Sequence, residues 1–183
     1  MPNHVFNRLT FFDNDSDMTA SISGELFRHI LVSLQGNDPD RSYGSVDFNV
    51  LVPMPEGYMD DGRWYEWAIQ NWGTKWNAYD CGHNDATNQL WFNTAWSGAH
   101  TIVRLISKRF PETIVLHEWA DSDDIGGNVG KRYYNRGVQF LQEVPEQYST
   151  EAYDMTASIL DIDLEDYGLV LGSDGLYHSI FDD

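Results

Sequence analysis

The order of apolar patterns along the chain is the feature that most constrains its fold. Residues 4–12 have the β-branched and aromatic bias of a strand, and residues 18–34 place apolar side chains at helical spacing. Residues 46–52 alternate apolar and polar side chains, which predicts a second strand. The same order then recurs as strand, helix and strand over 89–95, 97–110 and 113–119. This pattern predicts an α+β fold, a ferredoxin-like split βαβ sandwich with helices on one face of an antiparallel sheet.

Breaker residues divide these elements from one another. The acidic run Asp13–Asp17 predicts the N-cap of the first helix, and Gly36–Asp40 ends that helix. After the glycine-rich turn at Gly126–Gly130 we expect a strand over 137–144, then a helix over 150–160 and a hairpin around Gly172–Gly175. The expected organisation is a ferredoxin-like domain over 1–144 with a Trp-rich insertion at 57–88, and an acidic helix-and-hairpin extension over 145–183 packed on it.

The charge balance restricts the partners of this chain. It has 29 Asp and Glu against 11 Lys and Arg, a formal net charge of −18. Direct binding to nucleic acid or to an anionic membrane surface is disfavoured, because both depend on Lys and Arg. Such a field favours encounter with a basic protein, including one whose cleft normally holds DNA or RNA. The alternative is that the acidity only keeps the chain soluble.

The acidity is concentrated at the C-terminal end. Residues 137–183 carry eleven Asp and Glu and no Lys or Arg. Neighbouring carboxylates without basic partners repel one another, so they suit a surface that meets a basic cleft, or the surface of a dimer. The candidate partner-binding residues are Glu151, Asp154, Asp161, Asp163, Glu165, Asp166 and Asp174.

The single cysteine and the N-terminal sequence indicate the compartment. Cys81 is the one cysteine, so no intrachain disulfide and no four-thiolate metal site can form. The N-terminal residues have neither a basic n-region nor an apolar h-region, and no run of 18 apolar residues occurs. We therefore expect a cytoplasmic protein that uses no cofactor.

Several short motifs superficially suggest metal or nucleotide sites. Asp13, Asp15 and Asp17 alternate like calcium ligands, but Met18 and Gly24 stand where a calcium loop needs Gly and Glu. The run His117–Asp121 lacks the second His of a zinc helix and reads as a strand, while Cys81–His83 is expected in a surface loop. Gly126–Gly130 lacks the Lys of a phosphate-binding loop.

Two features support a rival interpretation as a small enzyme or a ligand-binding domain. Loss of Met1 would leave Pro2 as an N-terminal secondary amine, a possible general base, with Arg8 available to bind a substrate carboxylate. Lys75 lies between Trp72 and Trp76, where indole faces could hold a cation or a ligand. We favour the structural interpretation of these tryptophans, in which both are buried in the core.

Several motifs together resemble a known family. They are Met1–Asn3 with Asn7–Leu9, and then Val52–Glu56, Trp72–Asp80 and Phe92–Ser97. Over roughly residues 1–144 the chain resembles the YubB-like, ferredoxin-like domain proteins carried by phages and plasmids. This resemblance implies a ferredoxin-like fold and a mobile genetic element as the source. It supplies no activity and no catalytic residues.

The sequence therefore predicts a non-enzymatic, acidic binding protein. Its expected partner is a basic host protein, in particular a nucleic-acid-binding or defence protein that the chain inhibits by imitating DNA. A homodimer remains the alternative use of the acidic surface, since ferredoxin-like sheets often pair.

Overall fold

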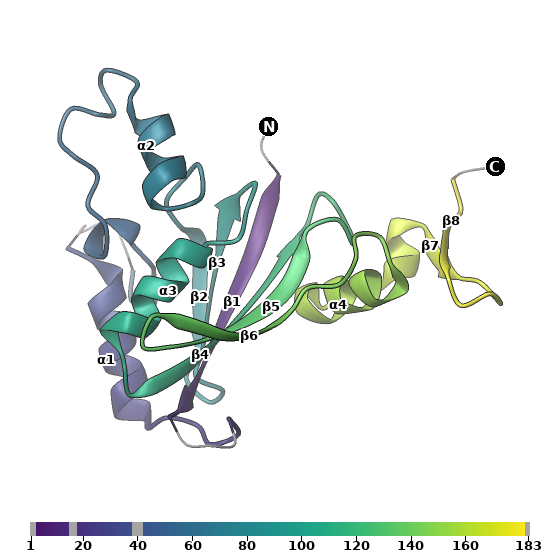
Figure 1. Ribbon diagram of the computed structural model, residues 1–183, viewed down its shortest axis with the longest axis horizontal. Coiled ribbons are helices and arrows are strands. Elements are labelled where there is room, and N and C mark those ends of the chain that lie inside the picture. The colour runs from purple at the N-terminus through teal and green to yellow at the C-terminus, as the bar shows by residue number, and fades with distance from the viewer. Residues whose placement is uncertain (1–2, 15–17, 38–41, 182–183) are drawn as a thin grey trace.

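A six-stranded antiparallel sheet forms the centre of the computed structural model, which describes residues 3–14, 18–37 and 42–181. The strands lie in the order β2-β3-β1-β4-β5-β6 (Figure 1). Leu9 in the central strand β1 lies opposite Leu90 of β3 on one side and His117 of β4 on the other. The strand bounds are β1 His4–Asp13, β2 Tyr79–Asn84, β3 Gln89–Ala95, β4 Thr113–Asp121, β5 Val129–Asn135 and β6 Val138–Glu143.

The first four strands have the ferredoxin-like arrangement. Helix α1 (Gly24–Gln35) follows β1, and helix α3 (His100–Arg109) joins β3 to β4. The resulting order β2-β3-β1-β4 is that of a βαββαβ unit. The hairpin β5–β6 then extends the sheet beyond β4.

Helices cover both faces of the sheet rather than one. Because side chains alternate along a strand, Leu9 and Phe11 of β1 enter the main core with α1 and α3, whereas Phe6 faces the opposite side. There Phe6 packs in a smaller core with Ala152 and Ile159 of helix α4 (Thr150–Leu160). The expectation of helices on one face of the ferredoxin-like domain is confirmed for α1 and α3, and α4, which belongs to the predicted C-terminal extension, packs on the opposite face.

The first helix begins later than the apolar spacing predicts. Helix α1 starts at Gly24, and Ser23 caps it by accepting a hydrogen bond from the Leu26 backbone N–H. Residues 18–22 instead run back along β1, where Ser21 bridges Phe12. The acidic cap predicted at Asp13–Asp17 is therefore wrong, since Asp13 ends β1 and Asp15–Asp17 lie outside the described residues. Helix α3 likewise begins at His100 instead of residue 97.

The strand predicted at residues 46–52 is wrong. This segment contains a short 3-10 helix, Phe48–Val50, whose N-cap is Asp47. The Asp47 carboxylate accepts hydrogen bonds from the Asn49 backbone and from the Asn77 amide, which holds the turn together. Val46 and Phe48 are still buried in the core, so alternation reports burial here without a strand.

The second strand of the βαββαβ unit is β2, which lies in the Trp-rich segment. Helix α2 (Trp64–Asn71) precedes it and ends at Trp72, next to Gly73 with a φ of 78°. Cys81–His83 belongs to β2, so the surface loop expected there is wrong. Short polar strands such as β2, with Gly82 in its middle, lack the apolar alternation by which sequence identifies a strand.

The C-terminal residues project beyond the sheet. Helix α4 spans Thr150–Leu160 as predicted, and a 3-10 helix, Leu164–Tyr167, leads to the hairpin β7 (Leu169–Leu171) and β8 (Tyr177–Ser179). We call residues 150–181 the acidic lobe, which forms the yellow-green end of Figure 1. None of the helices in the described ranges has the length and apolarity that would let it cross a membrane.

Candidate acidic binding site

All seven candidate partner-binding residues lie exposed on the acidic lobe. Glu151 and Asp154 lie on α4, and Asp161 is its C-cap residue. Asp163 precedes the 3-10 helix that contains Glu165 and Asp166, and Asp174 lies in the turn between β7 and β8. They are distributed over three segments: α4 with its C-cap, the 3-10 helix with its N-cap, and the turn between β7 and β8.

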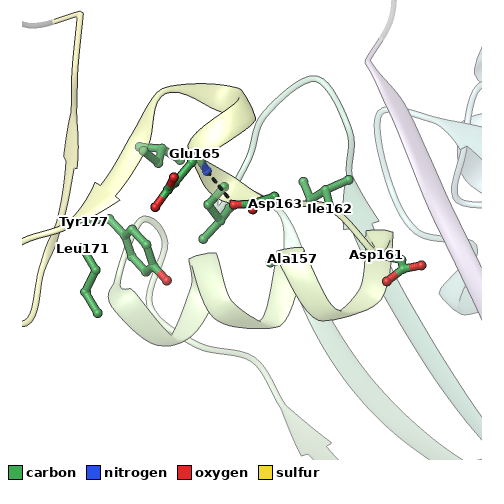
Figure 2. A pocket seen from close by; sticks show the side chains of 9 residues that line it. Ala157, Asp161, Ile162, Asp163, Glu165, Leu171 and Tyr177 are labelled. Atoms are coloured by element: carbon green, nitrogen blue, oxygen red, sulfur yellow. Dashed lines mark hydrogen bonds between the residues drawn. The ribbon is translucent and has the colours of Figure 1, made fainter.

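Three of these acidic residues line one hollow of about 510 Å³. Asp161, Asp163 and Glu165 line it beside apolar side chains of the same lobe, and Figure 2 shows Asp161 at one end and Glu165 with Tyr177 at the other. Its remaining walls are Ala157, Ile162, Leu164, Leu169 and Leu171. The hollow therefore combines apolar walls with negative charge.

Some candidate carboxylates also stabilise the lobe itself. Asp163 accepts a hydrogen bond from the Glu165 backbone N–H at 3.0 Å, drawn as the dashed line in Figure 2. The Tyr177 hydroxyl donates to Asp154 at 2.8 Å, and this bond raises the pKa of Tyr177. Asp174 pairs with His178 at 3.0 Å, and the hydrogen bond from His178 lowers the pKa of the Asp174 carboxyl.

The other four candidates are unengaged. Among the residues that the structure describes, the side chains of Glu151, Asp161, Glu165 and Asp166 make no hydrogen bond and no ion pair. Their charge is balanced only by solvent and salt. These four are the members of the set that a partner can reach without first breaking an internal contact.

Exposed apolar side chains accompany the carboxylates on the lobe. The hairpin and the residues after it leave Leu171, Leu176, Ile180 and Phe181 largely uncovered. Exposed apolar groups surrounded by charged residues are typical of surfaces that bind another protein. The seven predicted residues omit this apolar part of the surface, because exposure of a Leu or Ile cannot be read from hairpin patterning alone.

An ion-pair network attaches the lobe to the sheet. Glu118 of β4 accepts from Arg8 at 2.8 Å and from Lys131 at 3.1 Å, and Arg8 also donates to the Ile159 carbonyl at the end of α4. Burial alone would raise the pKa of Glu118, but the hydrogen bonds and charges of Arg8 and Lys131 lower it. Arg8 thus links Glu118 of the sheet to the C-terminal end of α4. Pro2 lies outside the described residues.

The Trp-rich segment is partly core and partly surface. Trp72 is buried, and its indole N–H donates to the Val52 carbonyl at 2.9 Å. Trp76 is partly buried, so both tryptophans are largely buried as predicted, with part of the Trp76 surface left exposed. Lys75 Nζ lies 5.1 Å from the centre of the Trp76 ring.

A pair formed by the buried His117 and the half-buried His100 was not predicted. His117 Nε2 lies 2.9 Å from Asn7 Oδ1, and His117 Nδ1 lies 3.4 Å from His100 Nδ1. Burial, followed by the charge of Arg132, lowers the pKa of His100 to about 3. Burial also lowers the pKa of His117 far below its usual value, so both rings are neutral at pH 7.

The motifs that superficially suggested metal sites do not assemble one in the described part of the chain. There, no group of three or more His, Cys, Asp and Glu side chains is placed to hold a metal ion. Cys81 Sγ accepts from the Val46 backbone N–H, and the His83 ring packs against Tyr43. His117 lies in β4 as predicted, and the turn predicted at Gly126–Gly130 is shorter than expected, since β5 already begins at Val129.

A match to a family model agrees with the fold. Residues 75–163 match the family model described as the ferredoxin-like domain in Api92-like protein. This match reaches Asp163, whereas the resemblance drawn from sequence motifs ends near residue 144. The family description confirms the predicted ferredoxin-like fold and names no activity.

One solved structure is similar to part of this chain. The crystal structure of the protein api92 from Yersinia pseudotuberculosis is similar to 58% of this chain, with 14% sequence identity and a TM-score of 0.47. The chain covers 41% of that structure. No curated protein is significantly similar to it.

Proposed function

We propose that this chain is a non-enzymatic binding protein whose acidic lobe holds a basic surface of another protein. The observation that carries the proposal is the hollow in which Asp161, Asp163 and Glu165 stand beside leucine and tyrosine side chains. Residues 137–181 contain no Lys or Arg that could neutralise these carboxylates from within the same region. We therefore expect a basic partner to supply the positive charge.

The hollow suits an arginine or lysine side chain. Both residues have an apolar stem that packs on surfaces such as Leu171 and Tyr177, and a charged end that pairs with carboxylates. Arginine fits best, because its planar guanidinium can donate to two carboxylates at once. Glu165 and Asp166, on the adjoining 3-10 helix, extend the negative field that attracts the partner.

The charge of the acidic lobe indicates the class of partner. The partner is a cytoplasmic host protein with a basic, nucleic-acid-binding surface, and the chain blocks that surface by taking the place of phosphates. A source on a phage or plasmid, implied by the resemblance to YubB-like proteins, supports a partner that serves in host defence. Pairing of two acidic lobes in a homodimer is disfavoured, because it would bring like charges together.

An oligo-arginine peptide and a charge-reversal variant test the proposal. Glu165→Lys/Asp166→Lys makes the net charge of the lobe four units more positive. It leaves the capping hydrogen bond of Asp163 in place, so the lobe should stay folded. Reversal should slow association of the peptide about tenfold, with a smaller effect on dissociation, because exposed charges act mainly on the encounter rate. Wild-type association should also slow steeply as salt rises.

A matched reversal elsewhere separates the site from overall charge. Asp60→Lys/Glu66→Lys changes the net charge by the same amount on exposed residues near α2. This control should slow association far less. Equal slowing by both variants, or association that ignores salt, would mean that the acidity only keeps the chain soluble. With a basic DNA-binding protein as partner, the wild type should displace bound duplex DNA and the reversal variant should not.

A further inference from the structure

A second hollow, of about 580 Å³, lies far from the acidic lobe, between the segment after the first 3-10 helix and helix α2. We call it the Trp pocket. Its walls are mainly apolar and aromatic: Met54, Pro55, Met59, Trp64, Trp72 and Trp76. Concave sites of this size, lined by aromatic groups with a few polar ones, are typical of small-molecule binding. The apolar side chain of Met59 is 66% exposed to water, so a ligand that covered it would gain hydrophobic contact.

Apart from the Glu56 carboxylate at the rim, the polar side-chain groups that remain available in the Trp pocket are hydrogen-bond donors. The amides of Asn49 and Asn77 are engaged, since both donate to Asp47 and both accept backbone N–H groups. The Trp72 indole N–H donates to a carbonyl. Within the described residues, the indole N–H groups of Trp64 and Trp76 have no acceptor. A ligand that satisfies this lining must supply acceptors.

Lys75 supplies a positive charge at the Trp pocket. Its Nζ lies 4.7 Å from the ring centre of Trp96, 5.1 Å from that of Trp76 and 5.9 Å from that of Tyr65. Among the described residues, no carboxylate comes within 4.0 Å of this ammonium. The rings hold it by cation–π attraction, and its hydrogen-bond donors stay free for a ligand.

Backbone strain at Trp96 supports a role for this arrangement. Trp96 has a φ of 71°, an unfavourable conformation for a bulky residue, yet 43% of its surface is exposed. Hydrogen bonds from its N–H to the Asn3 carbonyl and from the Asn128 amide to its carbonyl hold the backbone there. Strain of this kind is concentrated at functional sites. Here the strained backbone places the Trp96 ring over Lys75 Nζ.

We infer that the Trp pocket binds a small organic carboxylate with a flat apolar body. The body packs on the indole rings of Trp64 and Trp76 and on the methionine side chains, and the carboxylate pairs with Lys75 Nζ. Glu56, which also lines the pocket, is exposed at its rim and opposes a negative ligand. Lys75 should therefore raise the affinity for a carboxylate and Glu56 should lower it. Each effect can be tested by its own substitution.

Calorimetric titration with 2-naphthoate and its neutral analogue 2-naphthamide tests this inference. Wild type should bind 2-naphthoate about tenfold more tightly than 2-naphthamide, a difference of about 1.4 kcal/mol in binding free energy. Lys75→Gln should abolish that preference and leave naphthamide binding unchanged. Glu56→Gln should strengthen 2-naphthoate binding severalfold. Lys108→Gln, at an exposed lysine on α3, is the matched control and should change nothing.

Three outcomes would overturn the inference. They are failure of the wild type to bind either compound, equal affinity for both compounds, and a preference that survives in Lys75→Gln. Met59→Ser tests the apolar wall at an exposed position where the fold is not at risk, and it should weaken both compounds equally. Because the acidic lobe is untouched by these variants, oligo-arginine binding should persist in all of them, so this result is independent of the proposed function.

Discussion

The neutral pair His100 and His117 makes stability depend on pH. In the unfolded chain a histidine takes up a proton near pH 6.5, whereas in the folded state burial lowers the pKa of His100 to about 3. Between these values the unfolded state holds more protons, so acid favours unfolding. The stabilisation is complete above pH 6.5 and is lost as pH falls toward 3, by about 1.4 kcal/mol per pH unit for each histidine.

A single substitution isolates this contribution from that of the many carboxylates. His100→Gln should lose about 1 kcal/mol less unfolding free energy than wild type as the pH falls by about one unit below 6.5. Urea unfolding of both proteins at each pH gives the comparison. His29→Gln, at an exposed histidine on α1, should follow the wild type. Parallel pH profiles for wild type and His100→Gln would show that the buried ring does not resist protonation.

At the scale of elements, helix α4 should open independently of the sheet. Its docking surface is small, with only Ala152 and Ile159 fully buried among its apolar side chains, and Ser149 caps its N-terminus by accepting from the Ala152 N–H at 3.1 Å. Ser149→Ala should cost about 1 kcal/mol of helix stability. Amide hydrogen exchange should therefore speed up about fivefold in α4 and not in β1, since local opening needs less free energy than global unfolding.

The rescue variant makes this expectation specific. Ser149→Asp retains a capping oxygen and adds a negative charge that suits the helix N-terminus, so α4 should exchange as in wild type. If Ser149→Ala instead accelerated exchange in α4 and β1 together, the helix and the sheet would form one cooperative unit.

The same elements show what sequence can predict. Helix α4 was predicted with its observed bounds, and the structure shows local determinants there, since Ser149 caps the helix. The strand at 46–52 was wrong because its alternation reflects burial of Val46 and Phe48, while Asp47 imposes a turn through contacts with Asn77. Strand β2 was missed because its partners are supplied by β3 and its own sequence is polar. The acidic residues were found by charge, but the hollow among them depends on how α4 meets the hairpin.

For the whole molecule, the net charge of −18 should make salt stabilising. Like charges held together by folding repel one another, and the repulsion is strongest where no basic residue intervenes, as in the acidic lobe. The screening length falls from about 30 Å at ~0.01 M salt to about 10 Å at ~0.1 M, so added salt relieves this repulsion in the folded state. The unfolding free energy should rise over that range.

Neutralising the lobe should remove much of this salt effect. In Asp161→Asn/Asp163→Asn/Glu165→Gln/Asp166→Asn, asparagine tolerates the left-handed backbone at residue 161 and can still cap the 3-10 helix at residue 163. The variant should gain on the order of 1 kcal/mol at low salt, the repulsion expected of a few close charges in water.

A control variant with the same net charge decides whether the repulsion is local. It neutralises exposed carboxylates outside the lobe: Asp60, Glu66, Asp80 and Glu112. Because these side chains are spread over different elements, their removal should relieve less repulsion than removal of four neighbours on one lobe. Chemical unfolding of the three proteins across a salt series measures the difference. Two results would contradict this expectation: a wild type that loses unfolding free energy when salt is added, or two variants that gain unfolding free energy equally. Either would mean that the acidic lobe holds no local charge repulsion that a basic partner could relieve on binding.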